Sequence, residues 1–288
     1  MIPKVKSVCL SGGGVTGMAH VGVLSFLEKR GVLASVETYV GTSIGAVVAS
    51  LFVIGCTSAE IMDLLTKIDA TTAFSFSSCA QFFNCYGVDS GEFFMAHLVD
   101  QFIRKHVSPT ITFNEIAVKF NKRLIMVGTN LLTHAAVYFS PESHGDMRIL
   151  DAVRISISIP FVLSAVPYQG ALHVDGGVTD NFAFQYCVED SGGACLASCI
   201  CSMPPRPIRN IEDFIYNLFA ASLNSKRDNV ARDKRIIVIP TDTFDSFSFT
   251  ATEEQKQALF QTGVRAAEKY IRNLETVCHP KIKRRHSI

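Results

Sequence analysis

Hydrophobic residues in the first part of the chain alternate between short continuous runs and helical spacing. The run Lys6–Leu10 predicts a buried strand, and the apolar positions of Met18–Lys29 recur with helical periodicity. A second strand, predicted over Val36–Val40, leads into an apolar helix that continues through Phe52. Strand followed by helix, twice in succession, is typical of an α/β fold.

The same alternation continues along the rest of the chain. Further strands are expected over Arg123–Gly128, Ala135–Phe139, Leu172–Val174, Ala194–Cys201 and Arg235–Ile239. Further helices are expected over Gly91–Lys105, Asp180–Val188, Ile211–Leu223 and Glu253–Leu274. No internal repeat or linker interrupts residues 1–288. We therefore expect one α/β domain in three layers, with helices on both faces of a mostly parallel sheet.

The composition limits which partners and which cellular compartment this domain can have. The net charge of +1 gives no strong field to attract a nucleic acid. The longest apolar run, Ile44–Cys56, is shorter than the ~20 residues that span a bilayer, and the N-terminus lacks a signal-peptide core. An odd number of cysteines, nine, without histidines at ligand spacing, favours reduced thiols over disulfides or a metal site. We expect a cytoplasmic protein whose membrane contact, if any, is peripheral.

The basic end of the chain is the one local charge run. Lys281, Lys283, Arg284 and Arg285 lie close together within residues 279–288. A solvated, frayed tail is the favoured interpretation, because disorder concentrates at termini. Attraction to an anionic membrane surface is the alternative.

A glycine-rich segment follows the first predicted strand. It reads Gly12, Gly13, Gly14, Val15, Thr16, Gly17, and its tight turn at Ser11–Gly14 exposes backbone N–H groups at the start of a helix. Such a turn suits a phosphate or a reaction oxyanion. The spelling also matches the dinucleotide fingerprint, but Glu37, the acidic residue at suitable distance, begins the next strand instead of ending it. No lysine follows the glycines, which excludes a Walker-type phosphate loop.

A serine lies at the next turn from strand to helix. Ser43 is flanked by Gly41 and Gly45 in a G-x-S-x-G pattern, the spacing of a nucleophile elbow. An α/β-hydrolase would place several strands before this serine and supply an acid and then a histidine. Only two strands precede Ser43, and His20, His173 and His279 are more typical of packing or surface positions.

A carboxylate ends a later strand. Asp175 is followed directly by Gly176 and Gly177, which lets another group approach the backbone closely. A simple β-turn explains such a pair equally well in isolation. The combination of this segment with the glycine turn and the serine elbow indicates a catalytic site.

The three segments together resemble the patatin-like phospholipase family. Asp151–Phe161 is similar to the block that precedes the catalytic aspartate in that family, and Gly17–Leu24 matches its first helix. The resemblance extends in order over residues 5–184. The family often has Arg or Lys where this chain has Thr16, which leaves that cation without a counterpart in the glycine segment.

The resemblance implies a Ser–Asp dyad without histidine, metal or other cofactor. Ser43 would attack a lipid acyl ester to form an acyl-enzyme, and Asp175 would act as the base. Backbone N–H groups of Gly12, Gly13 and Gly14 would hold the oxyanion, and Gly17 would allow close helix packing. A carboxylate at its ordinary pKa is a weak base for serine, so we expect burial to raise the pKa of Asp175.

Several questions stay open at this level. Phospholipid, lysophospholipid and neutral glyceride all suit the motifs, and the oligomeric state is not encoded in them. The aromatic segment from Phe74 to Tyr86 suits either a flap over acyl chains or ordinary packing. The alternatives are a non-catalytic lipid-binding scaffold, an acyltransferase using the same acyl-enzyme, and a dinucleotide-binding oxidoreductase. The last is disfavoured, so we expect no nucleotide cofactor and no nucleic-acid partner, and a lipid or membrane-surface substrate.

Overall fold

The β-strands form a large central sheet and a small second one. A computed structural model describes residues 4–68, 86–200, 207–209, 211–224, 233–241 and 251–278. Eight strands make up the central sheet: β1 (Ser7–Leu10), β2 (Thr38–Thr42), β4 (Arg123–Asn130), β5 (Ala135–Phe139), β7 (Val166–Tyr168), β8 (Ala171–Asp175), β9 (Cys195–Ile200) and β10 (Ile236–Ile239). The second sheet pairs β3 (Gly87–Asp89) with β6 (Phe161–Leu163).

Helices connect most of these strands. The α-helices are α1 (Met18–Lys29), α2 (Ile44–Val53), α3 (Ser58–Lys67), α6 (Glu92–Arg104), α7 (Phe113–Phe120), α8 (Pro141–His144), α9 (Ile149–Ser156), α10 (Gly177–Asp180), α11 (Phe184–Asp190), α12 (Ile211–Asn224) and α13 (Glu253–Cys278). Two 3₁₀ turns, η1 (Gly14–Gly17) and η2 (Val32–Ser35), flank α1. None of these described helices combines the length and the apolar character needed to cross a bilayer.

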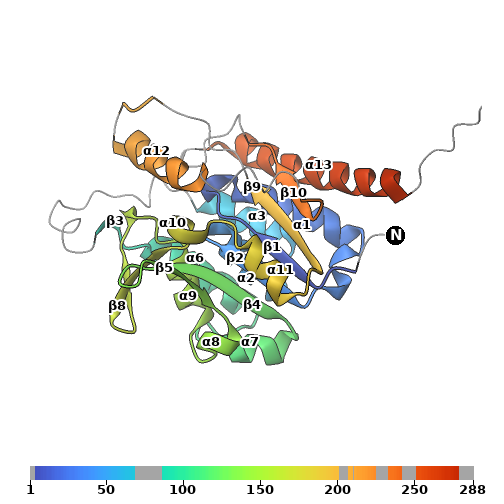
Figure 1. The fold of residues 1–288 in the computed structure, drawn as a ribbon. Helices are drawn as coiled ribbons and strands as arrows, with labels where there is room; N and C mark the ends of the chain where they lie inside the picture. The colour runs from blue at the N-terminus through green and yellow to red at the C-terminus, as the bar shows by residue number, and fades with distance from the viewer. Residues whose placement is uncertain are drawn as a thin grey trace, which may run out of the picture.

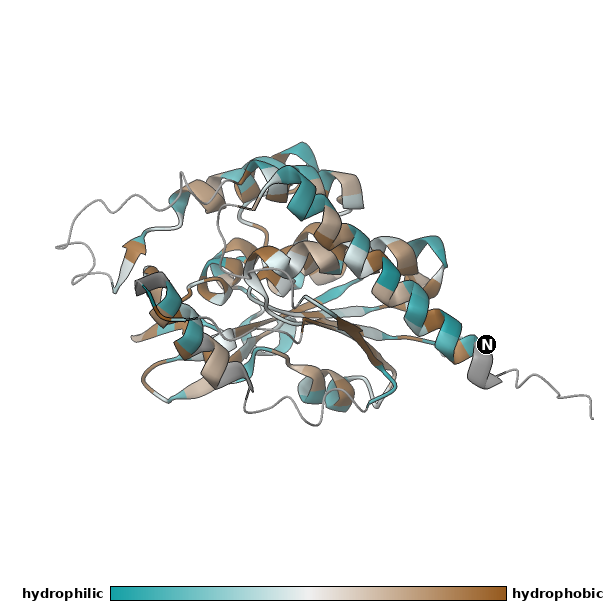
Figure 2. Cartoon of the chain, turned by 90° about the horizontal axis from the view of Figure 1, so that it is seen from above, coloured by the Kyte–Doolittle hydropathy of each residue, from teal (hydrophilic) through white to brown (hydrophobic). Residues whose placement is uncertain are grey.

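The central sheet is mostly parallel and lies between two helical layers (Figures 1 and 2). Its strand order is β10-β9-β1-β2-β4-β8-β7, with β10 to β4 parallel and β5, β7 and β8 antiparallel to their neighbours. Successive side chains of a strand point to opposite faces. Val8 and Leu10 accordingly join the core under α1, α2 and α13, whereas Cys9 joins the core under α11. The expected three-layer α/β fold is confirmed.

Strand β4 determines where the site forms. One edge of β4 pairs with β5, and the opposite edge pairs first with β2 and then with β8. Val127 of β4 lies opposite Thr42, and the next residue, Gly128, lies opposite Asp175. The carboxyl ends of β2 and β8 therefore meet along one edge of β4, although 132 positions separate Ser43 from Asp175.

Most predicted elements are present, and two predictions are wrong in extent. The strand predicted over Val36–Val40 runs instead from Thr38 to Thr42, because Gly41 and Thr42 pair with β4. The helix predicted over Asp180–Val188 is interrupted between α10 and α11. The carbonyl of Asn181 in this interruption accepts a hydrogen bond from the Gly12 amide instead of continuing a helix.

Helices α3 and α7 were not predicted, although each begins with a capping box. Thr57 and Glu60 form the box of α3, and Thr112 and Glu115 form that of α7. Cys201, the aromatic positions from Phe74 to Phe83 and the basic tail at residues 279–288 lie outside the described residues.

Candidate active site

Ser43 occupies a strained turn between β2 and α2. Its φ of 55° is uncommon for a residue with a side chain and costs about 1–3 kcal/mol. The turn needs glycine on both sides, because a Cβ at Gly45 would lie 2.5 Å from the carbonyl oxygen of Leu10 and one at Gly41 equally close to Gly45. The Ser43 amide donates to Oγ of Ser156 at 2.8 Å. The resulting geometry holds the serine side chain at the carboxyl edge of the parallel strands.

Asp175 is the last residue of β8 and accepts a hydrogen bond from the hydroxyl of Ser43. Ser43 Oγ donates to Asp175 Oδ2 at 2.6 Å, and the Gly177 amide donates to Oδ1 at 2.6 Å. Gly176 packs against β4, where a Cβ would come within 2.4 Å of the Val127 carbonyl oxygen. The carboxyl group is buried, and this desolvation raises the pKa of Asp175 to about 7, despite the opposing effect of the two hydrogen bonds. Asp175 therefore titrates near neutral pH, and its ionised form is basic enough to accept a proton.

The glycine loop lies beside this pair, but its amides are not equivalent. The Gly12 amide donates to the Asn181 carbonyl at 2.9 Å. Within the described part of the chain, the amides of Gly13 and Gly14 form no such bond. Thr16 Oγ1 donates to the Gly13 carbonyl at 2.6 Å and so braces the loop. Gly13 and Gly14 therefore remain the candidate oxyanion donors, and the Gly12 amide is committed elsewhere.

Gly17 and Ser156 have packing roles around the serine turn. A Cβ at Gly17 would lie 2.3 Å from the side chain of Ile44, so this glycine allows η1 to approach α2. Ser156 Oγ accepts from the Ser43 amide and donates to the Val127 carbonyl at 2.6 Å, which connects α9 to the serine turn and to β4. The sequence placed Ser156 in a recognisable block without indicating this anchoring role.

A second buried serine, Ser198, pairs with His20, whose ring supports the start of the glycine loop at Ser11. His20 Nε2 lies 2.9 Å from the Ser11 carbonyl, and His20 Nδ1 lies 2.8 Å from Ser198 Oγ. Nε2 must therefore carry the proton, and Nδ1 accepts from the serine. Burial lowers the pKa of His20 to about 4, which keeps the ring neutral. From its sequence position, His20 was expected only to pack or to lie at the surface.

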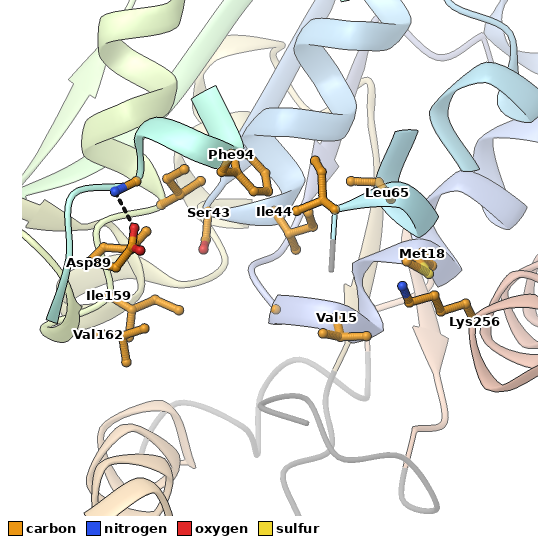
Figure 3. Close-up of a pocket in the computed structure, with 15 residues that line it drawn as sticks. Val15, Met18, Ser43, Ile44, Leu65, Asp89, Phe94, Ile159, Val162 and Lys256 are labelled. Atoms are coloured by element: carbon orange, nitrogen blue, oxygen red, sulfur yellow. Dashed lines mark hydrogen bonds between the residues drawn. The ribbon is translucent and has the colours of Figure 1, made fainter. Parts of the chain in front are cut away.

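An apolar cavity of about 140 Å³ opens beside Ser43 (Figure 3). Ser43, Asp89 and Lys256 are the described lining residues with strongly polar side chains. The others are glycine or apolar: Gly14, Val15, Met18, Ile44, Leu65, Ile68, Gly91, Phe94, Ile157, Ile159, Val162 and Leu163. Figure 3 shows the Ser43 hydroxyl directed toward this space. A cavity of this composition suits hydrocarbon chains.

The other candidate residues lie away from this chemistry. His173 is buried against Phe139 and Tyr168 and does not contact Ser43. Glu37 precedes β2 and so lies at the opposite end of that strand from the glycine loop, which argues against a dinucleotide site. No group of three metal-binding side chains occurs among the residues that the structure describes.

Comparison with known proteins places this α/β chain among the lipid hydrolases. The family model of patatin-like phospholipases matches residues 8–188, and the chain belongs to this family. It is 29% identical over 286 residues to the uncharacterized protein R571 of Acanthamoeba polyphaga mimivirus, covering 93% of this chain and 94% of the relative.

Two further proteins are similar to this chain over different extents. The probable lipid hydrolase 463L of Invertebrate iridescent virus 6 is 30% identical over 186 residues, which cover 64% of this chain and 63% of the relative. The crystal structure of VipD from Legionella pneumophila superposes with a TM-score of 0.68 at 17% identity, covering 94% of this chain and 67% of VipD. The second likeness concerns the fold alone.

Proposed function

We propose that this protein hydrolyses lipid acyl esters through an acyl-enzyme on Ser43. The observation that carries the proposal is the 2.6 Å hydrogen bond from Ser43 Oγ to the buried carboxylate of Asp175, formed beside an apolar cavity. A nucleophile bonded to a base of matched pKa is the geometry that acyl transfer requires. The substrate is a phospholipid, lysophospholipid or acylglycerol, reached by peripheral contact with a lipid surface.

In the first half of the reaction, Asp175 takes the hydroxyl proton as Ser43 Oγ attacks the ester carbonyl carbon. The amides of Gly13 and Gly14 stabilise the oxyanion that develops on the carbonyl oxygen. Each preorganised donor of this kind is worth about 3 kcal/mol of transition-state stabilisation. Protonated Asp175 then gives its proton to the departing alcohol, which leaves the acyl group on Ser43.

In the second half, a water molecule replaces the alcohol. Asp175 removes a proton from this water, which attacks the acyl carbon, and the proton returns to Ser43 as the fatty acid leaves. The apolar cavity holds the acyl chain throughout. An acyltransferase would differ only in using a second alcohol in place of water, and a lipid-binding scaffold would stop before the first step.

Labelling with a fluorophosphonate tests the proposal directly. The purified protein is treated with the probe, and the adduct is located by peptide mass spectrometry. Hydrolysis of a short-chain ester and of a phospholipid is measured alongside for the wild type, Ser43→Ala and Asp175→Asn. We expect an adduct on Ser43 and loss of turnover in both variants.

Ser198→Ala is the matched control, because it removes a buried hydroxyl on the other side of β1. It should keep both labelling and turnover. Folded wild-type protein that binds lipid without labelling or turnover would refute the proposal in favour of a scaffold. Acyl transfer to an added alcohol that outpaces hydrolysis would favour the acyltransferase.

A further inference from the structure

Lys256 is a buried cation in the wall of the Ser43 cavity. It belongs to the first turn of α13, and only 8% of the residue is exposed. Its Nζ donates to the carbonyl oxygen of Thr66, in the last turn of α3, at 2.9 Å. Figure 3 shows Lys256 near Met18, on the opposite side of the cavity from Asp89 and with Ser43 between them. The ammonium group thus lies in the same cavity as the nucleophile.

The charge of Lys256 has no counter-ion among the described residues. None of their carboxylates forms a salt bridge with it. Asp89, the other charged lining residue, accepts from the Gly91 amide at 2.5 Å and interacts electrostatically with Arg154. An ammonium group carries three N–H donors, and Thr66 accounts for one of them. A buried cation with spare donors is costly unless an anion joins it.

We propose that Lys256 binds the phosphate of the lipid substrate and gives the enzyme a preference for anionic phospholipids. This inference rests on the hydrolase function proposed above. Figure 3 shows Ile159 and Val162 to one side of Ser43 and Met18 and Lys256 to the other. An ester carbonyl placed at Ser43, with its acyl chain along Ile159 and Val162, leaves the phosphate-bearing alcohol to extend toward Lys256. In this arrangement the phosphate-binding cation comes from α13. The glycine segment offers no cation, because it has Thr16 where the family often has Arg or Lys.

A purely structural role for Lys256 makes a different prediction. A cation near the C-terminus of α3 stabilises that helix regardless of the substrate. Loss of this contact would lower activity equally toward every ester. If Lys256 binds the head group, its loss instead lowers activity only toward esters that carry phosphate, mainly by raising KM.

The test compares three esters with the same acyl chain: an acylglycerol phosphate, an acylglycerophosphocholine and an uncharged monoacylglycerol. Lys256→Met should lower kcat/KM for the acylglycerol phosphate about tenfold or more, the value of one charge-assisted hydrogen bond. Hydrolysis of the monoacylglycerol should stay within about twofold, and Lys256→Arg should retain the preference for phosphate. Lys269→Met is the matched control, because Lys269 is an exposed lysine of the same helix.

Equal losses for all three esters, or no loss for any, would overturn the proposal. A binding measurement separates this failure from failure of the hydrolase function. Titration calorimetry of Ser43→Ala with an ether-linked alkylglycerol phosphate requires no turnover. Binding should weaken about tenfold when Lys256→Met is added, and an uncharged ether analogue should show no change. A wild type that cleaves nothing would refute the hydrolase while this titration still decides the role of Lys256.

Discussion

Two buried serines flank β1, and each is hydrogen-bonded to a titratable side chain. Ser43 follows β2 and donates to Asp175 at 2.6 Å, whereas Ser198 lies in β9 with its hydroxyl 2.8 Å from the His20 ring. Both residues are almost fully shielded from solvent. On hydrogen bonding and burial alone, either pair has the form of a nucleophile with its base.

Backbone geometry and access separate the two pairs. Ser43 lies at a strained turn and lines the cavity, whereas Ser198 is held within a regular strand between β1 and β10. Desolvation also acts oppositely on the partners: it raises the pKa of Asp175 to about 7 and lowers that of His20 to about 4. The geometry of the first pair therefore suits proton transfer, whereas the second pair stays neutral and supports the glycine loop.

Removing each hydroxyl should give the largest contrast. Ser43→Ala should lower kcat by about 10⁴-fold or more, because no acyl-enzyme can form. Ser198→Ala should change kcat less than tenfold and cost about 1 kcal/mol of stability through its hydrogen bond to His20. Ester hydrolysis and urea denaturation of both variants measure these effects. Comparable losses of activity in the two variants would contradict the assignment of Ser43, and not Ser198, as the nucleophile.

Asp175→Asn should lower activity and raise the stability of the folded protein. Loss of the base should lower kcat/KM about 10³-fold. The folded-state pKa of about 7 exceeds the ordinary value of 3.8, so folded wild type binds more protons between these limits and loses stability as pH rises through them. Removing the buried charge should therefore stabilise the protein at pH 8 by up to about 4 kcal/mol. The gain should vanish toward pH 4, and a variant less stable at pH 8 would contradict this account.

The pH dependence of wild-type turnover is the next test of the contrast. Asp175 must be ionised to accept the serine proton, so kcat/KM should fall about tenfold per pH unit below about 7. The His20 ring stays neutral over most of this range and should add no inflection above pH 5. A profile that stays level down to pH 5 would mean that another group is the base.

Local sequence patterns predicted the strands, helices and turns of the site better than the contacts between them. The strand and helix around Ser43 and the position of Asp175 followed from local periodicity and glycine spacing. Their contact depends on consecutive residues of β4 pairing with β2 and β8, and no local pattern encodes that register. The hydrogen bond that occupies the Gly12 amide likewise comes from Asn181, in a segment where a continuous helix was expected.

The hydrogen bonds of His20 to Ser11 and Ser198 could not be predicted from the sequence for a related reason. His20 lies on a helix whose other residues are mostly apolar, so the pattern indicates packing and nothing more. Its partner Ser198 is 178 positions away and becomes a neighbour only because β9 pairs with β1. Lys256 lines the Ser43 cavity and contacts α3 through a residue 190 positions away in the sequence. Such contacts are tertiary and leave no short-range signal in the sequence.

His20→Gln should show the smallest effect on turnover and act mainly on stability. The glutamine amide can still donate to the Ser11 carbonyl, so kcat should change less than about fivefold, while loss of the Ser198 bond costs about 1 kcal/mol at pH 8. The folded-state pKa of about 4 is below the ordinary 6.5, so wild type loses stability as pH falls from 6.5 to 4, by about 3 kcal/mol. The variant lacks this loss, and its urea-denaturation stability should overtake that of wild type within this window. Because Asp175 titrates in both proteins, its opposite contribution cancels in the difference, and parallel curves would show that His20 is not buried as a neutral brace.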